Sequence, residues 1–476
     1  MAFALAALLC FASGFLLISL FRPPASLLLQ ISLAVGYGLG IFSITFFLTR
    51  IAGSAQIMQV DAAVFAVLLI AQFLTRRQAT PQMGLLSQDI RNTPQWLRRA
   101  ITATFALTCL SASYVAIMRT LAHPHGDGWD AFAIWNLHAR FLALNGSEWR
   151  DAFTSVISWS HPDYPLLTPA ATAHFWRYLG RDAAFVPALI GLTFTFITAG
   201  LLYSVLSILR GRMLAMLGAI SLLATPAFIE QGTAQYADVP LSFFMLATLA
   251  LLCLHARASS DGGWKSGRLV VLAGMAAGLA AWTKNEGLLF LASTISARML
   301  VFWFPENEGS ISHRPRTLSA FWRSSVPLWL GMIPLLAVIL YFKHSVAGPS
   351  ELFADHSTIL HKLLTPSRYW AVIKWYAKSP FRFGHWMAIP GTVLLAGFYI
   401  AAARKPATKK DSAFRTSSVA LVLTLTGYFV IYLITPYEIY WHLRFSLDRL
   451  FLQLWPSTIF LLFLAMPELV NAKSAR

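Results

Sequence analysis

"AGMAAGLAAWTKNEGLLFL", residues 273–291, joins two apolar runs through a short charged turn. The runs extend over 269–283 and 287–304, and a membrane-spanning helix needs about 20 mostly apolar residues. The turn is too tight to be a soluble loop. Its Lys284 and Glu286 therefore lie at the membrane boundary, where charged side chains usually pair with one another or serve a functional pathway. The stretch predicts a hairpin of two spanning helices with a charged tip.

The rest of the chain has the same apolar character. Of its 476 residues, 57% are hydrophobic and 12% are charged, whereas soluble domains carry about 25% charged residues. We predict an all-α polytopic membrane protein with about thirteen spans, because a bilayer requires backbone groups to be satisfied within each segment. The predicted spans are 1–21, 25–49, 57–75, 101–119, 183–208, 213–229, 239–256, 269–283, 287–304, 324–342, 385–403, 417–434 and 450–466.

The formal charge of +17 does not indicate nucleic-acid binding, because the basic residues are dispersed between apolar runs. Connections rich in Lys and Arg stay in the cytoplasm. These are 76–99, 210–212, 257–268, 314–323 and 404–415, so the remaining connections are predicted to be external: 120–182, 230–238, 284–286, 343–384 and 435–449. Most acidic residues fall in the external segments. Acidic residues contribute little to topology, so this bias indicates either a binding or catalytic face or an ordinary solvated surface.

The predicted organisation has three parts. Residues 1–100 hold three N-terminal spans and a cytoplasmic loop, 101–304 form a core that includes the external loop 120–182, and 305–476 hold the C-terminal spans and the loop 343–384. The first external loop mixes aromatic and charged residues, which favours helices lying in the membrane interface; an aromatic belt without chemistry is the alternative. The three cysteines all fall within spans and indicate no disulfide framework.

Two motifs in the first external loop carry candidate functional residues. "GDGWDAFAIW" (126–135) places Asp127 and Asp130 three residues apart, on one side of a helix that starts near Trp129. Capping of that helix is the alternative role for either aspartate. "HPDYPLLTP" (161–169) holds His161, Asp163 and Tyr164 between prolines that enforce an extended path.

Two later motifs add more ionisable residues. "QYADVPLSFF" (235–244) places Asp238 at the start of a helix, just before a proline, which is also an ordinary structural pattern. "YWHLRFSLDRLFLQLWP" (440–456) brings His442, Arg444 and Arg449 to the head of the last predicted span. Arg444 and Asp448 are four residues apart and could instead form a simple helical pair.

In their order and placement, these motifs resemble the integral-membrane glycosyltransferases of the GT-C fold. The relatives are the protein O-mannosyltransferases, the aminoarabinose transferases of lipid A and the Rgt-type lipopolysaccharide transferases. The resemblance runs over about 101–304 and includes "ATPAFIEQGTAQYADVPLSFF" (224–244), with "GLAAWTKNEG" (278–287) as its most specific piece. The first motif departs from the family's paired acids, because Ala131 follows Asp130. The choice between Asp127 and Asp130 therefore stays open.

The resemblance implies an inverting transfer of a sugar from a polyprenyl-phosphate donor to a glycan, lipid or protein acceptor. The reaction would take place on the external face of a bacterial cytoplasmic (inner) membrane. Asp130, or else Asp127, would accept the proton of the attacking hydroxyl, as a general base does. The donor phosphate would meet cationic side chains, namely Lys284, Arg444 and Arg449, with His442 behind them. The substrate-binding candidates are His161, Asp163, Tyr164, Asp238 and Glu286.

The sequence leaves alternatives open for the use of a metal cofactor and for the class of function. Some relatives use a divalent metal, Mg²⁺ or Mn²⁺, and His161, Asp163 and Asp238 offer suitable ligand atoms, although their spacing fits no compact metal motif. A transporter or flippase of lipid-linked sugars would also need a polar groove. Such proteins usually carry ionisable residues or broken helices near mid-membrane and internal repeats, whereas here the charges gather at one face. A non-catalytic scaffold would tolerate replacement of the external acids.

Overall fold

The computed structural model describes residues 1–54, 56–75, 94–144, 146–260, 267–304, 317–353, 356–386, 391–393, 395–396 and 412–466. Every regular element among them is helical, which confirms the all-α prediction. The helices are α1 (Ala2–Phe21), α2 (Leu27–Ile51), α3 (Ile57–Thr75), α4 (Gln95–Ala122), η1 (Ala131–Trp135), α5 (Asn136–Leu144), η2 (Gly146–Phe153), η3 (Ser155–Ser160), α6 (Leu167–Leu179), α7 (Phe185–Arg210), α8 (Arg212–Leu223), α9 (Pro226–Thr233), α10 (Asp238–Ser260), α11 (Arg268–Thr283), α12 (Asn285–Trp303), α13 (Leu318–Ser345), η4 (Glu351–Phe353), α14 (His356–Leu363), α15 (Pro366–Arg382), α17 (Ser412–Ile434) and α18 (Ile439–Ala465).

Ten helices in the described ranges are long and apolar enough to cross a membrane, or eleven if one bent pair counts as a single span. That pair, α8 and α9, replaces the predicted continuous span 213–229. It bends by 64°, and Pro226 begins its second helix, where a proline lacks the N–H that would continue the first. Helix α11 is the short apolar helix of the hairpin. Most of the predicted span 385–403 lies outside the described residues, as do 76–93, 261–266, 314–316 and 404–411 of the predicted basic loops.

The last span begins at Ile439, not at 450 as predicted. The charged residues of this segment are therefore part of the helix and not of an external loop. Glu438 caps the helix by accepting hydrogen bonds from the backbone N–H groups of Tyr440 (3.0 Å) and Trp441 (2.6 Å). This longer helix carries Arg449 along its side, toward the centre of the bundle.

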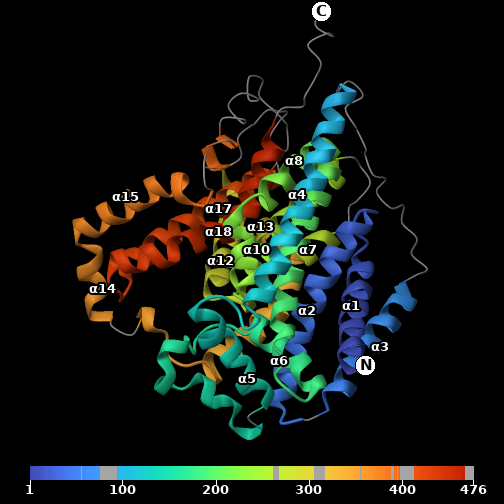
Figure 1. Cartoon of the computed structure of the whole chain (residues 1–476), viewed down its shortest axis with the longest axis vertical. Coiled ribbons are helices and arrows are strands. Elements are labelled where there is room, and N and C mark those ends of the chain that lie inside the picture. Colours follow the sequence, from blue (N-terminus) through green and yellow to red (C-terminus); the bar gives the residue numbers. More distant parts are fainter. Residues whose placement is uncertain are drawn as a thin grey trace, which may run out of the picture.

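Helix α10 is the most enclosed of the spans and packs against α7, α11 and α18. In Figure 1, α1–α3 lie on one flank of the bundle and α14 and α15 on the opposite flank. The segment that holds α5 and α6 gathers at the end of the bundle away from the C terminus. Because α10 begins with Asp238, its central position places this carboxylate in the interior, at the same end.

Much of the first predicted external loop is packed into the protein. Residues 167–176 of α6 are all buried, and α6 packs against α2 and α5. Trp135, Trp149 and Trp176 are buried, whereas Trp129 and Trp159 are exposed. The aromatic side chains of α6, Phe175 and Trp176, therefore form part of the core.

The segment after α13 is attached to the bundle at several points. Arg368 in α15 donates hydrogen bonds to the backbone oxygens of Tyr432 and Leu433 at the end of α17. Beyond α15, the Gly384 oxygen accepts from the Ala227 N–H (3.1 Å). The contact satisfies a backbone donor exposed by the break between α8 and α9, as buried backbone groups require.

Candidate functional site

Four segments that are distant in sequence bring ionisable side chains together at one end of the bundle. Asp130 precedes η1, Asp238 begins α10, Lys284 lies between α11 and α12, and Arg449 projects from α18. Close packing at the hairpin holds Lys284 in place, because a Cβ on Gly287 would lie 1.9 Å from the Ala280 oxygen. The charged tip predicted from the sequence is thus part of a larger ionic cluster, which we define as Asp130, Asp238, Lys284, Glu286 and Arg449.

Arg449 joins two carboxylates of the ionic cluster. Its Nη1 lies 2.7 Å from Asp130 Oδ2, and its Nη2 lies 2.9 Å from Asp238 Oδ2. The guanidinium carbon stands 4.6 Å from the centre of the Tyr236 ring, a favourable arrangement for a cation over an aromatic face. Burial raises the pKa of Tyr236 to about 12, with Asp130 adding to the rise, so its hydroxyl stays neutral.

Lys284 occupies the other side of Asp238. Its Nζ lies 3.1 Å from Asp238 Oδ1 and 2.8 Å from Glu286 Oε1. Burial lowers the pKa of the Lys284 ammonium, but Asp238 and Glu286 outweigh that effect and hold its pKa above the ordinary value. Lys284 therefore remains a cation at neutral pH. Gln453 in α18 donates a further hydrogen bond to Asp238 Oδ1.

The charges within the ionic cluster do not cancel. Asp130, Asp238 and Glu286 are three carboxylates, whereas Lys284 and Arg449 are two cations, which leaves one negative charge in excess. Asp238 has no exposed surface and shares both cations. The Asp130 side chain is 22% exposed and contacts one cation of the cluster. Asp130 is therefore the most exposed of the three carboxylates, because the Glu286 side chain is 12% exposed and Asp238 is fully buried.

A second group of polar residues adjoins the ionic cluster. Asn285 Nδ2 donates to Asp163 Oδ2 (2.7 Å), and Lys343 Nζ donates to Asn285 Oδ1 (2.6 Å). Lys343 also donates to the Asp163 backbone oxygen. Asp163 is buried, and the Lys343 side chain is 27% exposed. This arrangement adds the Lys343 cation, at the end of α13, to the site. The sequence did not predict a site residue there.

Tyr164 forms an aromatic wall between these two groups. Its ring stacks on His161, with centroids 4.7 Å apart, and on Trp135, with centroids 5.7 Å apart. The Lys284 ammonium lies 5.8 Å from the centre of the same ring. Burial raises the pKa of Tyr164 well above its usual range, and nearby carboxylates, beginning with Glu286, raise it further. Tyr164 thus keeps a neutral hydroxyl, while its ring packs against His161 and Trp135.

The two aspartates of the first motif have different surroundings. Asp127 pairs with Arg119 of α4 at 2.6 Å, and both side chains are more than 30% exposed. The turn between Asp127 and Asp130 depends on Gly128, whose φ is +86°. A Cβ at this position would lie 2.5 Å from the Tyr236 hydroxyl. Asp130 makes no side-chain capping hydrogen bond, so capping does not account for it. It faces Arg449 at the start of a π-helix, a feature often found at functional sites.

The candidate phosphate-binding residues of α18 also differ in their surroundings. Arg449 joins the ionic cluster, whereas Arg444 is exposed and lies over the Phe445 ring. His442 has a different partner from the two arginines, because its Nδ1 lies 2.8 Å from Thr435 Oγ1. The structure therefore brings two of the four predicted phosphate-binding residues, Lys284 and Arg449, to one place.

The described residues do not assemble a metal site. No group of three or more His, Cys, Asp or Glu side chains with suitable geometry occurs among them. His161 stacks on Tyr164, Asp163 bonds Asn285, and Asp238 bonds Lys284 and Arg449. The three candidate ligands thus have other partners.

Comparison with known proteins supports one family relationship. Residues 163–318 match the model of the family described as dolichyl-phosphate-mannose-protein mannosyltransferase. This match confirms the resemblance to GT-C glycosyltransferases and supports a membrane glycosyltransferase of mannosyltransferase type. It includes Asp163, Asp238 and Lys284, whereas Asp130 and Arg449 lie outside it. Neither the search of curated proteins nor that of solved structures gave a match.

Proposed function

We propose that this protein transfers a glycosyl group from a polyprenyl-phosphate donor to an acceptor hydroxyl at the external face of a bacterial cytoplasmic membrane. The acceptor is a glycan, a lipid or a protein. The observation that carries the proposal is the convergence of Asp130, Asp238, Lys284 and Arg449 at one end of a membrane bundle. A scaffold would have no need for such a costly arrangement of partly buried charges.

Lys284 and Arg449 would bind the donor phosphate. The phosphate leaves with a developing negative charge, and preorganised cations stabilise that charge in the transition state. Arginine can bind phosphate in a bidentate manner, and lysine contributes a point charge. Glu286 and Asp238 keep both cations oriented toward the site before the donor enters. Lys343 adds a third positive charge near Asp163.

Asp130 would act as the general base. The acceptor oxygen attacks the anomeric carbon, its bond to the sugar forms as the bond from sugar to phosphate breaks, and Asp130 takes the proton. A single displacement of this kind inverts the anomeric centre. In the described structure Asp130 is bound to Arg449. A donor phosphate would compete for the same guanidinium, so that donor binding releases the carboxylate for proton transfer.

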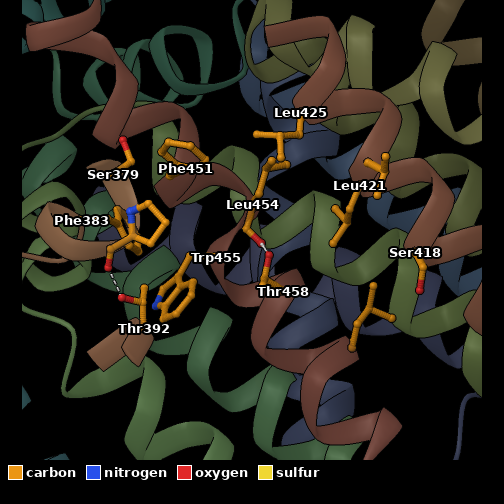
Figure 2. A pocket seen from close by; sticks show the side chains of 13 residues that line it. Ser379, Phe383, Thr392, Ser418, Leu421, Leu425, Phe451, Leu454, Trp455 and Thr458 are labelled. Carbon is orange, nitrogen blue, oxygen red and sulfur yellow. Dashed lines mark hydrogen bonds between the residues drawn. The ribbon is translucent and has the colours of Figure 1, made fainter. Parts of the chain in front are cut away.

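An apolar cavity is the candidate site for the tail of a lipid-linked donor. The cavity has a volume of about 380 Å³ and lies between the end of α15, α17 and α18. Figure 2 shows Phe383, Phe451 and Trp455 on one side of it and Leu421 and Leu425 on the other. Phe451 is two residues from Arg449 along α18. Residues two apart on a helix point to nearly opposite sides of it, so a donor with its phosphate at Arg449 would pass its isoprenoid tail around α18 to reach this cavity.

The proposed function is tested by incubating the purified protein with polyprenyl-phosphate donors that carry different labelled sugars and with a panel of acceptors. We expect label in the acceptor, release of polyprenyl phosphate and inversion at the anomeric carbon. The Lys284→Met variant should lose most of the donor-dependent rate. Movement of intact labelled donor across vesicles, without release of polyprenyl phosphate, would instead identify a flippase and contradict the proposal.

Filling the apolar cavity should weaken the use of long-chain donors. Leu425→Trp places a larger side chain in the cavity, and we expect the donor KM to rise about tenfold, the equivalent of 1.4 kcal/mol of lost binding. A donor with two isoprene units should be affected much less. Val430→Trp is the matched control, because Val430 is exposed on the same helix and does not line the cavity. Equal effects on both donor lengths would argue against a tail site here.

A further inference from the structure

Helix α3 packs against α1 and α2 and has few buried residues. Ile57 and Asp61 are its buried residues, and most of its remaining surface faces away from the protein. Asp61 is 1% exposed. A carboxylate inside a spanning segment is costly unless it has partners, and such residues usually have a function. Asp61 lies far from the ionic cluster in the chain, and the proposed chemistry does not use it.

Asp61 binds two side chains of α6. Its Oδ2 lies 2.7 Å from His174 Nε2 and accepts a hydrogen bond from the Tyr178 hydroxyl, also at 2.7 Å. His174 and Tyr178 are four residues apart and so lie on one face of α6. His174 has no exposed surface, and the Phe42 ring of α2 packs against it with centroids 5.0 Å apart. The contact therefore fixes α6 against α2 and α3.

Helix α6 begins directly after the segment that carries Asp163. At this junction Ser43 of α2 donates a hydrogen bond to the Leu166 oxygen (3.4 Å) and accepts one from Trp282 Nε1 (2.9 Å). Trp282 stands two residues before Lys284. Helix α2 thus bonds to the backbone of one segment that supports the site and to a side chain of the other. Asp61 holds α6 next to this helix.

We propose that Asp61 is a positioning residue, through which the N-terminal helices α1–α3 set the distance between Asp163 and Lys284. The proposal rests on the proposed function and gives a role to helices that lie outside the matched region 163–318. Asp61 touches no substrate. It acts through α6, and small displacements of groups that orient substrate can lower rates strongly.

The test compares Asp61→Leu with Gln59→Leu, a control at an exposed position of the same helix. We expect Asp61→Leu to lower kcat about tenfold and to raise the acceptor KM, because a misplaced orienting group loses effective concentration. The donor KM should change less, since Lys284 and Arg449 are not carried by α6. Amide hydrogen exchange should become faster in residues 160–179 and stay unchanged in α10, as expected for a local opening.

Each outcome of this comparison is informative. Normal exchange in 160–179 together with a normal rate in Asp61→Leu would overturn the proposal, as would faster exchange throughout the chain with both KM values unchanged. If Asp61→Leu does not fold, Tyr178→Phe decides, because it removes one of the two contacts at nearly constant volume. Unchanged exchange of 160–179 in that variant would also overturn the proposal. If the wild-type protein transfers no sugar, the proposed function fails, but the exchange measurement still tests whether Asp61 positions α6.

Discussion

Asp130→Asn should lower kcat for glycosyl transfer by about 10³-fold, within the range that a general base contributes. The amide keeps the size of the side chain but cannot accept the proton of the acceptor hydroxyl. Its oxygen can still accept a hydrogen bond from Arg449, so the site should remain assembled. The measurement is single-turnover transfer from a labelled donor at saturating acceptor, together with the donor KM, which should stay within a few-fold of wild type.

Asp127→Asn is the matched control for this prediction. It makes the same chemical change three residues earlier, at a carboxylate that pairs with Arg119 and lies half exposed. Such surface pairs contribute about 1 kcal/mol or less. We therefore expect nearly normal turnover. If the two variants lose activity equally, or if Asp127→Asn alone is inactive, Asp130 is not the base.

The choice between these two aspartates shows what the sequence could and could not predict. Both lie in one motif, three residues apart, and local spacing puts them on one side of a helix. Their roles are separated by partners from other helices, Arg119 in α4 and Arg449 in α18. Nothing in the local sequence encodes those pairings. The motif could therefore be located, but its reactive member could not be identified.

The length of the last span was misjudged for a related reason. A stretch with His442, Arg444, Asp448 and Arg449 has the polarity of a loop, and hydropathy placed the helix start at 450. The structure starts it at Ile439, because Arg449 is compensated by Asp130 and Asp238 from other segments. Hydropathy describes a residue alone. It cannot include a partner that arrives only in the folded bundle.

The apolar helices themselves were predictable, because a bilayer imposes length and hydropathy on every span. The charged hairpin tip was predictable too, since the tight turn at 284–286 permits little else. Lys343 and Asp61 were missed because each is a single charge at the edge of an apolar run. Their importance follows from contacts to Asn285 and His174, which no spacing rule predicts.

Asp238→Leu should cause the largest loss of stability in the chain, about 3–5 kcal/mol, the cost typical of breaking a buried ion pair from one side. Asp238 has no exposed surface and accepts hydrogen bonds from Lys284, Arg449 and Gln453. Leucine fills a similar volume but removes the acceptor that Lys284, Arg449 and Gln453 share, so that, among the described residues, Lys284 keeps only Glu286 and Arg449 keeps only Asp130 as a carboxylate partner. The effect is measured as the midpoint of thermal unfolding in detergent. The loss of monodisperse protein on heating serves as the signal for unfolding.

Asp182→Leu provides the control, because it removes the same side chain from an ion pair that water can reach. Asp182 lies 2.9 Å from Arg140, and both side chains are 42% exposed. An exposed pair of this kind contributes about 1 kcal/mol or less, so unfolding should shift little. If the two variants unfold alike, burial of the ionic cluster is not what makes Asp238 important.

A charge-matched variant separates the loss of the carboxylate from the exposure of its partners. Asp238→Asn together with Lys284→Gln removes one charge of each sign and keeps hydrogen-bonding groups in place. Since contacting residues are energetically coupled, the double variant should be more stable than the sum of its two single changes predicts. It should nevertheless lose transfer activity, because the donor phosphate then loses one of its two proposed binding cations, Lys284. Stability without activity would show that transfer needs the charges of Lys284 and Asp238 themselves and not only a folded site, whereas simple additivity would mean that Lys284 and Asp238 do not act as a pair.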